Sequence, residues 1–62
     1  MKFEIGSYVS VVYAIVNDTY FKVIGKIGKT YILKDKRGSK HQVEYQYLRK
    51  VPKLLGLLEV GE

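Results

Sequence analysis

The sequence has no cysteine, no tryptophan, and only one proline and one histidine among its 62 residues. Without cysteine, neither disulfides nor thiolate metal sites can stabilise the fold. A chain this short buries only about 60% of the surface that its unfolded form exposes, so we expect one compact hydrophobic core. No apolar run approaches the length of a membrane-spanning helix, and the first four residues lack the apolar core of a signal peptide. We therefore expect a single soluble, cytoplasmic domain over residues 1–62.

Side chains that perform catalysis or bind metals are too few and too scattered for an enzyme. His41 is the only histidine, and no spacing of the acidic residues gathers carboxylates around it. A metal site needs several such ligands, and a hydrolytic triad needs a nucleophile, a base and an acid together. Gly28-Lys29-Thr30 is similar to the end of a phosphate-binding loop, but Val23 stands where that loop requires glycine. We expect no catalytic activity, no metal and no cofactor.

Positive charge is concentrated in the middle of the chain. The formal net charge is +5, from 11 basic and 6 acidic residues. Residues 22–53 hold eight lysines and two arginines against only Asp35 and Glu44, a local excess of +8, whereas both flanking segments are slightly acidic. Such a block attracts polyanions, of which nucleic acid is one. The alternative is a solvated lysine-rich surface with no binding role.

Two strands are predicted in the first half of the chain. Residues 7–16 are rich in β-branched and aromatic side chains on both faces, which favours a strand that is covered on both sides for part of its length. Turn-forming residues follow at 17–19. Tyr20–Ile27 alternates again, and Gly25 within it indicates a bulge or sharp bend. The alternation predicts Phe21, Val23, Gly25 and Ile27 on one face, with Lys22, Ile24 and Lys26 on the other.

Three more strands are predicted before residue 52. A tight turn at Gly28-Lys29 leads into a strand over Thr30–Lys34. A polar turn over 35–38 leads into a strand from Lys40 to Tyr45. A short fifth strand over 47–51 is expected to begin through a single helical turn. Five short strands with a turn every 8 to 12 residues are typical of a small barrel or sandwich.

The last eleven residues differ from the strands. Pro52 cannot donate to a sheet but suits the first turn of a helix. Four leucines surround Gly56, which predicts one or two helical turns that cover the end of a barrel. Glycine at this position makes the helix less stable than alanine would, by about 1 kcal/mol. The alternatives are an added strand or an exposed apolar patch that pairs two copies. The candidate contacts for a homodimer are Leu54, Leu57 and Leu58.

Two groups of residues are candidates for binding. Basic side chains on the second to fifth predicted strands and their turns can neutralise phosphates, and strand alternation places Lys22 and Lys26 on one face. Six tyrosines interleave with them, and an exposed tyrosine can stack on an unpaired base, although tyrosines in small β proteins more often line the core, as we expect for Tyr13. The candidate nucleic-acid-binding residues are Lys22, Lys26, Lys29, Lys34, Lys36, Arg37, Lys40, Arg49, Tyr20, Tyr31 and Tyr47.

Several segments together resemble a known group of folds. Gly6-Ser7-Tyr8-Val9-Ser10-Val11, Val23–Ile27, Tyr31–Asp35 and Leu48–Val51 look like the conserved pattern of SH3-like small barrels of the KOW and Tudor-like types. The resemblance covers about residues 5–51 and implies a five-stranded, strongly bent antiparallel barrel, followed by a tail over 52–62. It also implies binding of nucleic acid or peptides. A fainter similarity, carried by Pro52-Lys53-Leu54-Leu55, is to the seven-kilodalton archaeal chromatin proteins.

Taken together, these features predict an all-β protein: a five-stranded SH3-like barrel with a short C-terminal helical turn. We expect a small non-enzymatic module that binds DNA or RNA through a lysine-rich sheet face and hairpin tips. The alternative is a protein-interaction module, such as a small phage-type regulator or inhibitor that docks on an acidic partner. A third possibility is a structural protein that assembles through the C-terminal leucines.

Overall fold

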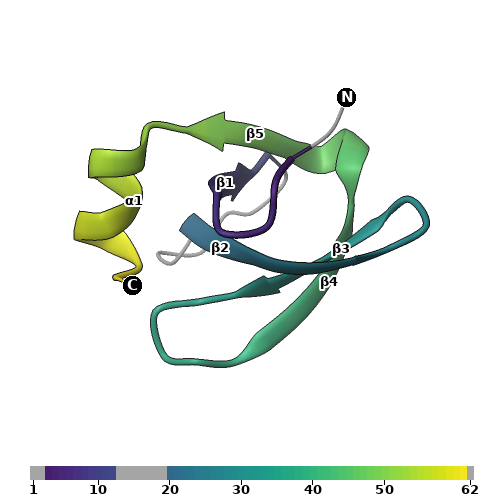
Figure 1. Ribbon diagram of the computed structural model, residues 1–62, viewed down its shortest axis with the longest axis horizontal. Helices are drawn as coiled ribbons and strands as arrows, with labels where there is room; N and C mark the ends of the chain where they lie inside the picture. The colour runs from purple at the N-terminus through teal and green to yellow at the C-terminus, as the bar shows by residue number, and fades with distance from the viewer. Residues whose placement is uncertain (1–2, 13–19, 62) are drawn as a thin grey trace.

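The computed structural model describes residues 3–12 and 20–61, which form one antiparallel sheet and a short C-terminal helix (Figure 1). The strand order is β4-β3-β2-β1-β5, so neighbours in sequence are neighbours in the sheet until β5 returns to pair with β1. In chain order the elements are β1 (Tyr8–Val11), β2 (Tyr20–Ile27), β3 (Thr30–Lys34), β4 (Lys40–Glu44), the 3₁₀ turn η1 (Tyr45–Tyr47), β5 (Leu48–Val51) and α1 (Lys53–Glu59).

Most element boundaries agree with the sequence prediction. The bounds of β2 and β3 are confirmed residue for residue, and β5 does begin through a single helical turn, η1. β4 ends at Glu44, one residue earlier than predicted, because Tyr45 begins that turn. β1 covers only Tyr8–Val11 of the strand predicted over 7–16. The rest of that prediction from residue 13, with Tyr13 and the turn at 17–19, lies outside the described residues.

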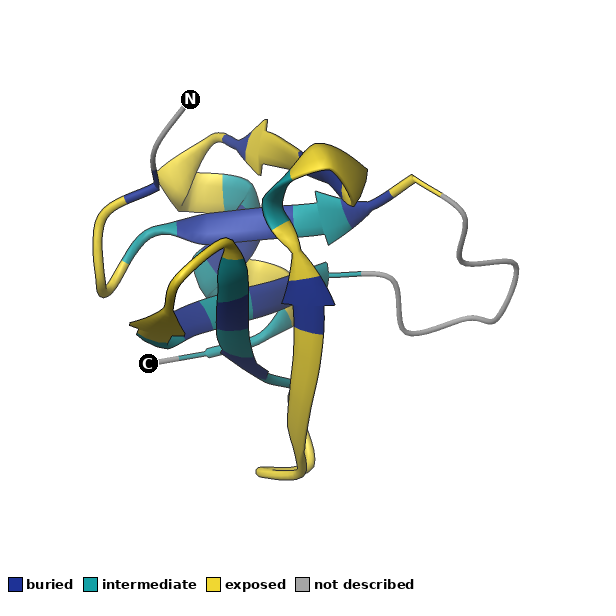
Figure 2. Ribbon diagram, turned by 90° about the vertical axis from the view of Figure 1, so that its right-hand side faces the viewer, coloured by how far each residue is buried: buried dark blue, intermediate teal, exposed yellow. Residues whose placement is uncertain are grey.

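The core lies on one face of the sheet, because successive side chains of a strand point to opposite faces. Val9, Val23 and Leu33 are fully buried at the centre of three adjacent strands. Figure 2 shows buried positions alternating with half-buried ones along β3 and the first half of β2. The core cluster consists of Phe3, Val9, Val11, Phe21, Val23, Tyr31, Leu33, Val43 and Leu48.

A bulge interrupts the pairing of β2 with β3. Val23 pairs with Leu33, but the next pair is Gly25 with Ile32, so Ile24 is an extra residue on β2. The bend that Gly25 predicted is therefore confirmed as a β-bulge. Beyond the bulge, side chains of β2 point to the opposite face from the one that simple alternation assigns. Ile27 accordingly lies away from the core and is 65% exposed, which corrects its predicted place on the face of Phe21 and Val23.

The helix α1 packs against β1 and β2, and it does so through a glycine. Gly56 is the one buried residue of α1, and its backbone lies directly on the ring of Tyr8. Tyr8 is 4% exposed and its hydroxyl donates a 2.8 Å hydrogen bond to the carbonyl oxygen of Gly61. The ring of Tyr8 thus lies on the face of β1 opposite the core and is covered by α1. This confirms the expectation that the first strand is covered on both sides for part of its length.

Candidate functional site

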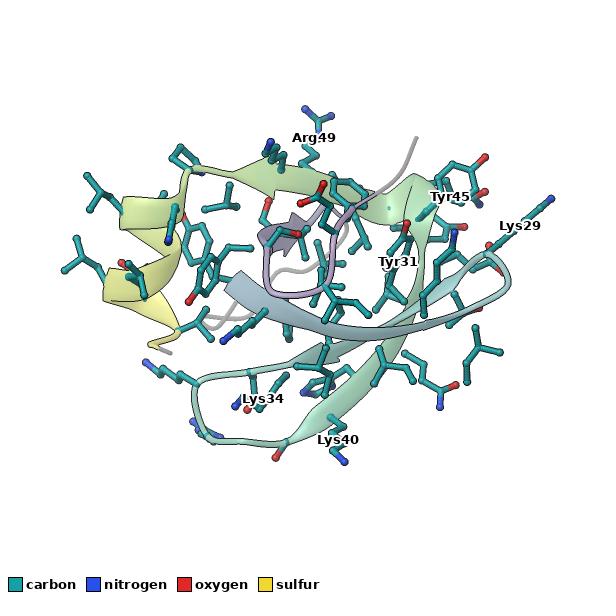
Figure 3. The ribbon with its side chains drawn as sticks, viewed as in Figure 1. Lys29, Tyr31, Lys34, Lys40, Tyr45 and Arg49 are labelled. Atoms are coloured by element: carbon teal, nitrogen blue, oxygen red, sulfur yellow. The ribbon has the colours of Figure 1, made fainter. Side chains whose placement is uncertain are left out.

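Three lysines lie side by side on adjacent strands. Lys22 on β2 pairs directly with Lys34 on β3, which in turn pairs with Lys40 on β4. Directly paired residues of an antiparallel sheet project from the same face. Since Val23 and Leu33, the sequence neighbours of two of these lysines, point into the core, the three lysines project outward. We call Lys22, Lys34 and Lys40 the lysine row; Figure 3 labels two of its members at the β3–β4 end.

The lysine row concentrates like charges at short range. Neighbouring strands lie about 4.8 Å apart, so the row spans only about 10 Å of sheet. Like charges placed directly opposite each other destabilise a sheet. Among the described residues, no carboxylate forms an ion pair with these three lysines. The ammonium of Lys22 lies 6.0 Å from the ring centre of Tyr8, which orients that lysine without neutralising it.

The acidic residue next to the row in sequence is occupied elsewhere. One carboxylate oxygen of Asp35 accepts 2.9 Å hydrogen bonds from the backbone N–H groups of Arg37 and Ser39 within the β3–β4 turn. Its other oxygen lies 2.9 Å from Nε2 of His41. The hydrogen bond from His41, with those from the two backbone N–H groups, holds the pKa of Asp35 below its ordinary value of 3.8. Asp35 therefore orders the turn and forms no ion pair with the lysine row.

The bulge separates Lys26 from the lysine row. Lys22 pairs with Lys34 on the outer face, whereas Lys26 pairs with Tyr31, whose side chain is buried on the core side. The ammonium of Lys26 lies 5.6 Å from the ring centre of Tyr31, on that same side. The prediction that Lys22 and Lys26 share one face is therefore wrong. The extra residue at Ile24 reverses the alternation between them.

The remaining candidate basic residues lie at separate places. Lys36 and Arg37 belong to the turn between β3 and β4, next to the ends of the row. Lys29 lies in the turn at the other end of β3, and Arg49 lies on β5 opposite Ser10 of β1. Figure 3 shows Lys29 and Arg49 well apart from Lys34 and Lys40. The sheet therefore brings together part of the basic set, and it leaves Lys26, Lys29 and Arg49 outside.

The candidate tyrosines differ in exposure. The prediction that Tyr31 presents its ring at the surface is wrong, because the residue is only 1% exposed. Its hydroxyl accepts a 3.0 Å hydrogen bond from the backbone N–H of Phe3, and the two rings meet edge to face. Tyr20 is half-buried at the start of β2, and Tyr47 is 37% exposed in η1. Only these two present ring surface to a ligand.

Two basic residues that the sequence analysis left out of the candidate set line a surface groove. Lys50 is the third residue of β5 and Lys53 is the first of α1, with Val51 and Pro52 between them. The groove has a volume of about 290 Å³. Its lining residues are Glu4, Ile5, Gly6, Ser7, Tyr8, Lys50, Val51 and Lys53. In the sequence, two lysines close to a proline were the only indication of this site. The groove itself forms because residues 4–8 lie against residues 50–53.

The C-terminal leucines divide between exposed and half-buried positions. Leu54 and Leu58 are 77% and 83% exposed, whereas Leu57 is half-buried. No helix among the described residues is long and apolar enough to cross a membrane. Within the same residues, no three side chains of the metal-binding types gather into a cluster.

Comparisons with protein-family models, with curated proteins and with solved structures find no match to this chain. Its function is therefore inferred from the residues and their geometry alone.

Proposed function

We propose that this protein binds nucleic acid, mainly through the phosphates, and that the lysine row is the centre of the interface. The observation that carries the proposal is the direct cross-strand pairing of Lys22, Lys34 and Lys40 on an outer sheet face. A sheet that places three cations opposite one another without a carboxylate loses stability. A polyanion that lies along the row offsets this repulsion.

The chemistry of the row suits phosphates better than bases. Lysine ammonium groups are flexible point charges with three donors each, and they hold phosphate oxygens without requiring one orientation. A row of about 10 Å reaches two or three phosphates. Lys36 and Arg37 extend the positive charge at the β3–β4 turn, and Tyr20, two residues before Lys22, lies at its edge. Binding should therefore depend strongly on salt and weakly on sequence.

We further propose that the sheet bends into an SH3-like barrel of the KOW or Tudor-like type. The order β4-β3-β2-β1-β5, in which the last strand returns to pair with the first, supports this architecture. The bulge at Ile24 and the 3₁₀ turn between β4 and β5 supply bends where a small barrel turns its corners.

A second candidate function is docking on an acidic protein. Leu54 and Leu58 on α1 are exposed apolar side chains, which a protein interface would bury and a nucleic acid would not. The two functions differ in their dependence on salt. Phosphate binding by three lysines should weaken with a log–log slope of about −2 to −3, from about −0.7 to −0.9 per phosphate. A protein interface should depend more on a few buried anchors.

The test is a fluorescence-anisotropy titration with labelled duplex DNA, single-stranded DNA and structured RNA at low and moderate salt. Lys34→Glu reverses the central charge of the row. Lys29→Glu makes the same charge change in the turn outside the row, and so serves as the matched control. We expect Lys34→Glu to weaken binding about tenfold or more and Lys29→Glu to have a clearly smaller effect, because ion contacts act over about a Debye length.

Two results would count against this function. Absence of binding to all three polymers at low salt would exclude it, and a pull-down with an acidic partner would then be the next step. Equal weakening by Lys29→Glu and Lys34→Glu would mean that net charge alone attracts the polymer. The lysine row would then not be an interface.

A further inference from the structure

β4 is an unprotected edge of the sheet. It pairs only with β3, and four of its five residues are exposed, with Val43 as the exception (Figure 2). Its pairing with β3 runs from Thr30–Glu44 to Lys34–Lys40 without a register shift. β4 also contains no proline. A regular exposed edge strand is a template to which another strand can add.

Hydrogen bonds at both ends of the β3–β4 pair reveal which backbone groups of β4 face β3. The N–H of Asp35 donates to the carbonyl of Ser39, and the N–H of Tyr45 donates to the carbonyl of Lys29, each at 3.0 Å. In an antiparallel pair, residues alternate between facing the partner strand and facing away. Counting in steps of two from Ser39 or from Tyr45 gives the same set of inward-facing residues.

The residues of β4 that face β3 are therefore His41 and Val43. The backbone N–H and C=O groups of Lys40, Gln42 and Glu44 point away from β3. Among the described residues, no backbone group bonds to those of Lys40 and Gln42 or to the N–H of Glu44. The C=O of Glu44, the N-cap of η1, accepts the first hydrogen bond of that turn. The free edge thus presents three outward positions, one at every second residue, which is the spacing that a further antiparallel strand requires.

We propose that this edge pairs with β4 of a second copy of the chain, antiparallel and centred on Gln42. In that register Gln42 lies opposite the partner's Gln42, and Lys40 lies opposite the partner's Glu44. All three pairs fall at outward-facing positions. The Gln42 pair exchanges two backbone hydrogen bonds, and in each Lys40–Glu44 pair the N–H of Glu44 donates to the C=O of Lys40. No other register of two identical strands pairs all three outward positions.

The side chains on the outer face are complementary in this register. Each Lys40 ammonium meets a Glu44 carboxylate from the other copy, and two-fold symmetry makes this ion pair twice. The two Gln42 side chains lie next to each other, where their amides can exchange hydrogen bonds. Because directly opposite residues project from one face, both lysine rows lie on the same side of the joined sheet. The dimer therefore places Lys22 and Lys34 of both copies on one side of the sheet, on either side of the Lys40–Glu44 ion pairs. The proposal does not depend on nucleic-acid binding.

The other edge of the sheet does not offer the same contact. The N–H of Val12 donates to the carbonyl of Tyr47 at 2.9 Å, so the outward positions of β5 are Leu48 and Lys50. Self-pairing of these positions would centre on Arg49 and set two arginines against each other. Like charges in that position repel. Charge thus selects β4 as the self-pairing edge.

The test is sedimentation velocity without nucleic acid, from about 10 µM to about 1 mM, the range of weak interfaces. The sedimentation coefficient of the parent protein should rise from that of a monomer toward that of a dimer as the concentration increases. Lys40→Glu and Glu44→Lys each turn two attractive contacts into repulsive ones, and each should weaken dimerisation about tenfold or more. The double charge reversal, Lys40→Glu with Glu44→Lys, recreates the complementarity and should restore the dimer.

A second measurement follows the backbone itself. Amide exchange of Gln42 and Glu44 should slow as the concentration rises, while that of His41 and Val43, bonded to β3 in every state, should not change. Gln42→Pro removes an outward donor that has no partner among residues 3–12 and 20–61, and it should abolish dimerisation, whereas Gln42→Thr should keep it. Circular dichroism verifies that each variant is folded.

The proposal is overturned if the chain remains monomeric up to about 1 mM, where only interfaces weaker than millimolar would escape detection. It is also overturned if a dimer forms that is indifferent to both charge reversals. A dimer that survives them and is lost in Leu58→Asp would instead use the exposed leucines of α1.

Discussion

Replacing Gly56 by alanine tests whether α1 rests directly on the ring of Tyr8. A Cβ built at Gly56 would lie 2.5 Å from both Cβ and Cδ1 of Tyr8, and closer still to Cγ. Carbon atoms in contact are normally 3.5–4.0 Å apart, so α1 would have to move outward by about 1 Å or more. That movement also threatens the hydrogen bond from the Tyr8 hydroxyl to Gly61.

The expected magnitude is the difference between two opposing effects. Alanine in a helix interior stabilises by about 1 kcal/mol relative to glycine. Overpacking costs about 1–3 kcal/mol, and loss of the hydroxyl hydrogen bond adds about 1 kcal/mol. The clash should win, so Gly56→Ala should lower the free energy of unfolding by about 1–3 kcal/mol. In a domain of this size that corresponds to a fall of about 5 to 20 °C in Tm.

The assay is urea unfolding followed by circular dichroism, in a double-mutant cycle with Tyr8→Ala. With the ring removed, the same Gly56→Ala change has space and should become neutral or stabilising by up to about 1 kcal/mol. The sign of its effect should thus reverse between the two backgrounds. The reasoning is refuted if Gly56→Ala stabilises the parent, or if it destabilises both backgrounds equally.

Three further results are expected. Tyr31→Phe removes the acceptor of the buried Phe3 N–H, so it should lower the free energy of unfolding by about 1–3 kcal/mol; an unchanged urea midpoint would contradict this. The pKa of Asp35 is lowered mainly by its hydrogen bond with His41, so the ionised carboxylate stabilises the folded state. This contribution to the free energy of unfolding is complete above the ordinary pKa of 3.8 and is lost as the pH falls through the lower pKa of the folded state. A carboxyl chemical-shift titration should accordingly have its midpoint below 3.8 and move upward in His41→Ala, and a midpoint at 3.8 in the parent would exclude that hydrogen bond. Leu58→Asp should change the unfolding free energy by less than about 0.5 kcal/mol, since the side chain is 83% exposed; a larger loss would mean that Leu58 is buried in solution.

The local pattern of the sequence was enough for most of the secondary structure. Period-two alternation with turn residues at 28–29 and 35–38 identified β2 and β3 to the residue. Pro52 followed by leucines identified α1. The burial of Tyr31 was also within reach, because it lies two residues before Leu33 on the same face of one strand. Its place among basic residues favoured a stacking role at the surface, yet its hydroxyl accepts a hydrogen bond from the N–H of Phe3 inside the protein.

The role of Gly56 could not be predicted from the sequence. In isolation it is a weak point in a short helix. Its actual contribution is the absence of a side chain where α1 meets Tyr8, a residue 48 positions earlier in the chain. Close approach of two backbone segments is a tertiary property, and no local pattern contains it.

The composition of the candidate interface, too, was decided by the tertiary structure. The sequence by itself determined that strands rich in lysine alternate with turns, because side-chain direction repeats every two residues. Which lysines meet depends on register. The two-residue turn that pairs Ile27 with Thr30 would, without a bulge, set Lys22 opposite Asp35; the extra Ile24 shifts it to Lys34. One inserted residue therefore replaces an attractive pair by the lysine row, and it turns Lys26 to the other face. The reason is that the pairing of two strands depends on the length of the turn and on every bulge between the paired residues.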